Sequence, residues 1–177
     1  GWLRRWLRRL VGADDYIAIG QPAPGATVSP TFTASGQVSP ASSSVKVALN
    51  GNSVNATVPG DGTWNATFNN IAGGNYTLQA CITGTMTCAA ESITVQGVTI
   101  SMPPPGGQVP QSFSASGQVY PANAGVTVTL NGTPASSVNV NGNNWSANFN
   151  SVPVGNPTLQ ACLTGTQVSK SETITVQ

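Results

Sequence analysis

Side chains able to carry acid–base, nucleophilic or metal chemistry are scarce in this chain. It has no histidine, which removes the commonest general base and metal ligand, and only five carboxylates in 177 residues. Asp14 and Asp15 are adjacent, Asp61 stands alone before a glycine, and Glu91 and Glu172 are distant in sequence. Calcium sites need several clustered carboxylates, which this spacing does not supply. The sequence therefore predicts a protein that is not an enzyme and uses no cofactor or metal.

Thiols and tryptophans are the remaining candidates. Cys81 and Cys88 flank the segment ITGTMT, which is typical of a hairpin turn, so directly opposed cysteines there could form a disulfide. The alternative is that all the cysteines are free thiols acting as small hydrophobic residues. Trp64 and Trp145 could stack on sugars, but each lies in a W-x-A-x-F alternation that favours a buried position.

The composition indicates an all-β body with almost no charge. Charged residues make up 6% of the chain, against about 25% in ordinary proteins, while 39% of residues are hydrophobic. Residues 1–15 hold four arginines and two aspartates, whereas the other residues carry a net charge of −1. A body this neutral lacks the basic surface that nucleic-acid binding needs. Turn-forming residues between short β-branched runs favour strands.

The chain contains two copies of one unit, offset by 81 residues without a gap. TFTASGQVSP (31–40) aligns with SFSASGQVYP (112–121), and LQACITG (78–84) aligns with LQACLTG (159–165). Cys162 repeats Cys81, but Ser169 replaces Cys88, so Cys162 has no intradomain partner. The predicted domains are 16–96 and 97–177, after an N-terminal segment 1–15.

Each copy reads as about seven short strands with turns between them. In the first copy these are roughly 16–20, 31–38, 45–49, 53–58, 63–68, 75–82 and 89–95. Strand alternation places Trp64, Ala66 and Phe68 on one side of their strand. Seven strands in a copy of this size have the rhythm of a Greek-key β-sandwich.

The pattern PAPGATVSPTFTASGQVSP…VKVALNG…GDGTWNATF…GGNYTLQACITG…ITVQ resembles the bacterial immunoglobulin-like domains of surface adhesins and phage virion proteins. The resemblance covers both copies, residues 16–177. The second copy departs from it at Asn156-Pro157, where the first copy has Asn75-Tyr76. The resemblance implies a spacer or adhesive module without chemistry of its own.

The N-terminal segment is unlike the rest of the chain. On a helical wheel its apolar residues separate completely from its arginines, and Gly12 follows, which predicts a short amphipathic helix. The predicted fold class is thus two tandem immunoglobulin-like sandwiches preceded by this helix. We expect the segment to anchor the chain to a partner protein; its own first domain, a membrane interface and membrane lysis of the antimicrobial kind are less favoured alternatives. The predicted anchoring residues are Trp2, Leu3, Arg4, Arg5, Trp6, Leu7, Arg8, Arg9 and Leu10.

Two functions follow from these features. In the first, the chain is a structural decoration protein of a multi-copy particle such as a phage capsid or tail, and it projects two domains that contact glycans or cell surfaces weakly. In the second, it is a bacterial cell-surface adhesin or pilus-type subunit. The predicted location is therefore the virion surface or, in the alternative, the extracellular surface of a bacterium. Arginines interrupt any secretion signal in the first ten residues, so we expect either that Gly1 followed an excised initiator Met or that a signal peptide has been removed.

Overall fold

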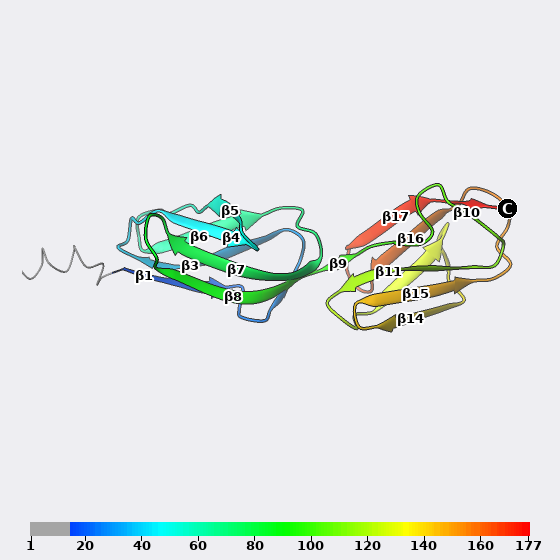
Figure 1. Cartoon of the computed structure of the whole chain (residues 1–177), viewed down its shortest axis with the longest axis horizontal. Helices are drawn as coiled ribbons and strands as arrows, with labels where there is room; N and C mark the ends of the chain where they lie inside the picture. The colour runs from blue at the N-terminus through cyan, green and yellow to red at the C-terminus, as the bar shows by residue number, and fades with distance from the viewer. Residues whose placement is uncertain (1–14) are drawn as a thin grey trace, which may run out of the picture. The chain divides into compact units, whose positions relative to one another are not determined.

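The computed structural model describes residues 15–177, which form two compact β units (Figure 1). One unit consists of the described residues up to Ile71 together with Asn75–Ile93, and the other of Ala72–Gly74 together with Thr94–Gln177. The predicted domain limits at residues 96 and 97 stay a prediction at the level of single residues.

The first unit contains two sheets that pack as a sandwich. One sheet has the order β1-β3-β6 and the other has the order β2-β8-β7-β4-β5. The first strand, β1, pairs antiparallel with β3 and has an irregularity between Ile19 and Gln21. The strands are β1 (Tyr16–Gln21), β2 (Thr27–Val28), β3 (Phe32–Ser39), β4 (Val45–Leu49), β5 (Asn52–Asn55), β6 (Thr63–Phe68), β7 (Gly74–Ile82) and β8 (Cys88–Val95).

The second unit repeats this arrangement with one more strand in the first sheet. Its sheets have the orders β14-β15-β11-β9 and β13-β12-β16-β17, and β10 pairs parallel with β18. The strands are β9 (Gly97–Val98), β10 (Gln108–Val109), β11 (Phe113–Tyr120), β12 (Val126–Leu130), β13 (Thr133–Pro134), β14 (Ser137–Asn141), β15 (Asn144–Phe149), β16 (Thr158–Leu163), β17 (Ser169–Thr173) and β18 (Thr175–Val176).

The strand order of both units is that of an immunoglobulin sandwich. In that fold the strands A, B, E and D share one sheet, and C, F and G share the other. Here β1, β3 and β6 form one sheet of the first unit, and β9, β11, β15 and β14 form the corresponding sheet of the second. The other sheet is built around β4, β7 and β8 in the first unit and around β12, β16 and β17 in the second. The fold therefore has the tandem immunoglobulin-like architecture that the sequence pattern predicted.

The core of each unit comes from strand alternation, as predicted. Trp64, Ala66 and Phe68 are buried, as are their equivalents in β15. Phe68 stacks on Phe32 with ring centroids 5.3 Å apart, and Phe149 stacks on Phe113 at 5.1 Å.

In each copy a glycine and a tryptophan allow the chain at one edge of the first sheet to lie close to its neighbours. The indole Nε1 of Trp64 donates a hydrogen bond to the carbonyl oxygen of Ala18 at 3.1 Å, and Trp145 donates to Thr99 at 2.9 Å. Gly36 lies opposite Trp64 in the register of β3 and β6, and a Cβ on it would overlap the Ala18 oxygen. Glycine is therefore required at this position for the close approach of β1 to β3.

The predicted fold class is wrong in one respect. It included an N-terminal amphipathic helix, whereas the described residues contain only strands, turns and loops, so the fold described is all-β without a helix. Residues 1–14, on which that prediction fell, lie outside the described residues. The physical basis for the prediction was weak, because helices below about 12–15 residues are marginal in water.

The two copies differ where the chain crosses from one sheet to the other. In the first copy Ala56 still donates its N–H to Val45, and Thr57 is the first residue that bonds to β6, through Asn65. In the second copy Ala135 donates to Val128 and Ser136 already bonds to Asn148 of β15. Because Ala135 corresponds to Val54, the crossover comes earlier in the second copy. Consequently β13 is shorter than β5, and β14 forms an additional strand beside β15.

Candidate functional site

Cys81 and Cys88 are joined by a disulfide in the structure. Their sulfurs lie 2.08 Å apart and their Cα atoms 4.1 Å apart, on the neighbouring strands β7 and β8. In the second copy Cys162 lies directly opposite Ser169, so this pair of positions carries no disulfide. The half-buried Cys162 is a free thiol, and its sulfur lies 3.4 Å from the carbonyl oxygens of Leu163 and Thr166. The disulfide cross-links one hairpin of the first unit.

The body tryptophans are not sugar platforms. Trp64 and Trp145 are each 1% exposed, and both indole N–H groups are already hydrogen bonded to backbone. A stacking site needs an accessible ring face, so the prediction that these residues are buried is confirmed.

Each copy holds one half-buried glutamate with an unsatisfied oxygen. Oε1 of Glu91 and Oε1 of Glu172 are buried and have no hydrogen-bond partner among the described residues. Burial raises the pKa of both carboxyls, and the nearby positive charge of Lys170 partly opposes this for Glu172. Glu172 lies opposite the buried Leu159 on the strand β17, at the edge of its sheet. A carboxylate that points inward at an edge strand discourages edge-to-edge pairing with other chains, which is a structural role.

One sheet of the second unit presents a lattice of neutral polar side chains, which we call the polar face. Its rows cross β11, β15 and β14, and all its members are exposed except the half-buried Ser116. Hydrogen bonds link the first row, from Ser114 to Asn148 at 2.6 Å and from Asn148 to Ser137 at 3.1 Å. The rows are Ser114, Asn148 and Ser137; Ser116, Ser146 and Asn139; and Gln118, Asn144 and Asn141.

The first unit carries the same polar face at the equivalent positions of β3 and β6. Thr33 lies opposite Thr67, with the hydroxyl oxygens 3.0 Å apart. The other two rows are Ser35 with Asn65 and Gln37 with Thr63. Hydroxyls and amides therefore repeat across strands at the spacing of a sheet, without a charge, in both copies.

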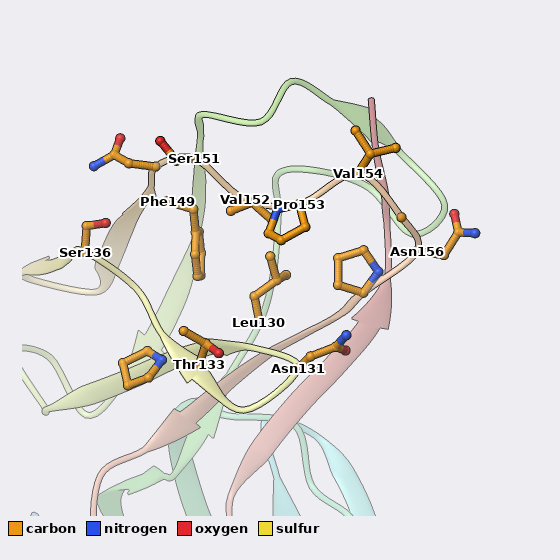
Figure 2. A pocket seen from close by; sticks show the side chains of 14 residues that line it. Leu130, Asn131, Thr133, Ser136, Phe149, Ser151, Val152, Pro153, Val154 and Asn156 are labelled. Atoms are coloured by element: carbon orange, nitrogen blue, oxygen red, sulfur yellow. The ribbon is translucent and has the colours of Figure 1, made fainter.

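A pocket of about 360 Å³ lies in the second unit between the loop 150–157 and the turn that joins β12 to β13 (Figure 2). Leu130 and Phe149 form its apolar floor, and Val152, Pro153 and Val154 lie along the loop on its far side. Polar side chains, which include Asn131 and Asn156, also line it. None of the lining residues is charged.

The pocket arises from the differences between the copies. The floor is shared, because Leu49 and Phe68 match Leu130 and Phe149. The other apolar lining residues differ between the copies. The second copy has Pro134, Pro153, Val154 and Pro157 where the first copy has Ser53, Ala72, Gly73 and Tyr76. The larger ring of Tyr76 is therefore missing at Pro157. In addition, the early crossover takes the chain away from β12 directly after Ala135.

The structure describes only some of the predicted site residues. Trp2, Leu3, Arg4, Arg5, Trp6, Leu7, Arg8, Arg9 and Leu10 lie outside the described residues, so the anchoring assignment stays a prediction. Sequence reasoning missed the pocket, although the departure at Asn156-Pro157 was the signal that could have located it.

The described residues also limit which other sites can be present. Residues 15–177 contain no group of three or more acidic, cysteine or histidine side chains placed to hold a metal ion. Within the same range, no helix has the length and apolar character of a membrane span.

Comparison with known proteins gives structural neighbours only. No protein-family model matches the chain, and no curated protein of similar sequence matches it. A pair of tandem immunoglobulin domains of titin is 12% identical over 93% of this chain and 97% of that chain, with a TM-score of 0.41. Fibronectin(III)-like modules of Clostridium thermocellum CbhA are 13% identical over 91% of this chain and 94% of theirs, with a TM-score of 0.39. These scores are low, and the immunoglobulin-like assignment rests on the strand order of each unit.

Proposed function

We propose that this chain is a non-enzymatic decoration protein of a multi-copy particle, displayed on a virion surface. The observation that carries the proposal is the polar face, a neutral lattice of hydroxyl and amide groups repeated on both units. Such a face suits a hydrated, projecting module, because it offers neither charge pairs nor a large apolar patch for a strong protein contact. The virion assignment is further supported by the resemblance of the sequence pattern to immunoglobulin-like domains of phage virion proteins.

We propose that the chain attaches to its assembly through residues 2–10. This segment holds all four arginines of the chain and two of its four tryptophans, and the other two, Trp64 and Trp145, are buried in the sandwich cores. Burial of tryptophan and leucine side chains against a protein partner contributes about 1.5–3 kcal/mol for each large side chain. Exposed ion pairs contribute about 0–1 kcal/mol each, so the apolar residues dominate the attachment.

Away from the attachment, the polar face contacts neutral glycans weakly. Each hydroxyl or amide exchanges a bond with water for a bond with a sugar hydroxyl, so the net gain at one site is small. Display of many copies on one particle multiplies such contacts through avidity. We therefore expect no strong affinity of the free chain for any one small sugar.

The test compares particles that carry the wild-type chain with particles that carry charged polar faces. Asn65→Asp together with Ser146→Asp places one carboxylate on each face. Gln79→Glu together with Gln160→Glu is the matched control, since these exposed residues lie on the opposite sheets. We expect weaker retention on immobilised neutral polysaccharide for the polar-face variant and normal retention for the control. The adhesive role would be excluded if all three kinds of particle were retained equally. It would also be excluded if bare particles were retained as well as those that carry the wild-type chain, and in either case a spacer role would remain.

A second candidate function, a bacterial surface adhesin or pilus-type subunit, is favoured by the disulfide between Cys81 and Cys88. Structural disulfides persist mainly in oxidising compartments such as the periplasm and the cell surface. Gene context distinguishes the two functions: virion genes beside an initiator Met directly before Gly1 favour the first, and an encoded signal peptide favours the second.

A further inference from the structure

We propose that the pocket of the second unit binds the tryptophan-bearing N-terminal segment of a second copy of this chain. The inference rests on the proposed function, since it takes residues 2–10 as the attaching element and names their partner. Neighbouring copies within the assembly would then be joined head to tail.

The size and walls of the pocket suit one large apolar side chain. At about 360 Å³ it lies at the small end of the range of roughly 300–1,000 Å³ found for ligand sites. Leu130, Phe149 and the buried Pro157 close the floor, and the exposed Pro153 and Val154 supply apolar surface at the rim. The first copy has Tyr76 in place of Pro157, and Ala72 and Gly73 in place of Pro153 and Val154, so these walls belong to the second copy.

The polar groups of the pocket suit the indole of tryptophan in particular. A buried indole needs an acceptor for its N–H group. The side chains of Asn150 and Ser151 line the pocket, are exposed and make no hydrogen bond to another described residue. Asn156 is held in place, because its Oδ1 accepts a hydrogen bond from Thr175 at 3.0 Å. The pocket thus combines an apolar floor with free acceptors at its mouth.

The chain itself supplies the side chain that fits. Of its four tryptophans, Trp64 and Trp145 are fully buried in the sandwich cores. Trp2 and Trp6 remain, within a segment whose arginines can stay in water beside a pocket that has no charged lining residue. No positive charge in the pocket opposes the approach of that cationic segment.

We take a second copy as the source of the segment. The segment precedes β1 of the first unit, whereas the pocket belongs entirely to the second unit. Each chain therefore carries one segment, which precedes the first unit in sequence, and one pocket, which belongs to the second unit. A contact of this heterologous kind joins successive copies and continues as long as copies are added.

The first experiment measures binding of a synthetic peptide, residues 1–14 with a fluorophore at its C-terminus, by fluorescence anisotropy. The receptor is the full chain with Trp2→Ala and Trp6→Ala, so that its own segment does not compete. We expect saturable binding that falls by about tenfold or more with a peptide in which both tryptophans are alanine, because buried aromatic anchors carry most of the affinity of small interfaces.

Receptor variants then locate the site. Pro157→Tyr and Val154→Gly install the residues of the first copy, and each should weaken binding of the peptide by about tenfold. Val54→Ser, which removes an exposed valine of the first unit, should leave binding unchanged. Thermal unfolding of each receptor shows whether it is folded. If one pocket variant does not fold, the other still tests the site.

The proposal is overturned if the peptide shows no binding at receptor concentrations up to about 1 mM, since that would exclude even a very weak affinity. It is also overturned if binding is the same with both pocket variants as with the parent receptor. Sedimentation of the wild-type chain tests the source of the segment: association that grows with concentration and is lost with Trp2→Ala and Trp6→Ala supports a second copy, and a monomer at all concentrations excludes it. If these tests fail while tryptophan substitution still detaches the chain from its particle, the proposed function stands and this inference falls.

Discussion

Replacement of Gly36 by alanine should lower the stability of the first unit far more than an ordinary glycine-to-alanine change in the same sheet. A Cβ at position 36 would overlap the carbonyl oxygen of Ala18 and lie 2.9 Å from Cζ2 of Trp64. Both contacts are with groups held in place, one by the backbone and the other by burial in the core. The outer strand β1 would have to move away from β3.

The cost follows from the contacts that this movement breaks. Overpacking of a filled site costs about 1–3 kcal/mol. Separation of the strands also removes the bond from the Trp64 indole to Ala18, and a buried polar group left without a partner costs about 1–3 kcal/mol. The two terms together give a loss of about 2–6 kcal/mol, against a total stability of about 5–15 kcal/mol for a domain.

Hydrogen exchange followed by mass spectrometry is the assay, because it reports on each unit separately. Gly36→Ala should speed exchange in β1, β3 and β6, and Gly117→Ala should do the same in the second unit only. Gly20→Ala is the matched control: it lies in β1, and its added Cβ would meet no heavy atom nearer than 3.6 Å. If Gly36→Ala and Gly20→Ala cost the same, the reasoning about close approach is wrong.

Three further predictions concern single side chains. As the pH falls from 7 to about 4, wild type should gain stability relative to Glu91→Gln or Glu172→Gln, by less than about 1 kcal/mol. The reason is that the raised pKa of each glutamate in the folded state favours proton binding by that state, and denaturant titrations at several pH values check this. Serine at both Cys81 and Cys88 should cost the first unit about 2 kcal/mol, given the short loop, and leave the second unit unchanged in calorimetry. Asn131→Ala should cost about 1–2 kcal/mol and Asn131→Gly less, since the residue has φ 46° and its side chain accepts the Thr158 N–H at 2.8 Å; urea unfolding tests the order.

The sandwich fold was predictable because each copy repeats a period-two pattern on both sides of its core. Trp64 and its neighbours of the W-x-A-x-F motif could be placed from alternation alone, since only one face of a sandwich sheet is buried. The short strand β2 could not be predicted, because two residues carry no periodic signal. The early crossover after Ala135 was equally inaccessible, since it depends on which sheet accepts a backbone N–H.

The candidate site was predictable only in part, for a related reason. Pairing of Cys81 with Cys88 followed from the hairpin spacing, as one of two alternatives. The pocket did not follow from any motif, because its walls come from two turns that are separate in sequence. Its lining consists of prolines, valines and neutral amide and hydroxyl side chains over Leu130 and Phe149, which form no recognisable motif. Comparison of the two copies position by position would have found it, since the rim residues are where the copies diverge.

The central proposal is that the chain attaches to its particle through its N-terminal tryptophans. Occupancy on purified particles tests this most directly, measured by quantitative mass spectrometry for wild type, for Trp2→Ala with Trp6→Ala, and for Arg4→Ala with Arg5→Ala. The account predicts that loss of the tryptophans removes most of the bound chain and that loss of the two arginines removes much less, since apolar burial exceeds exposed ion pairs. Full occupancy by the tryptophan variant would contradict it.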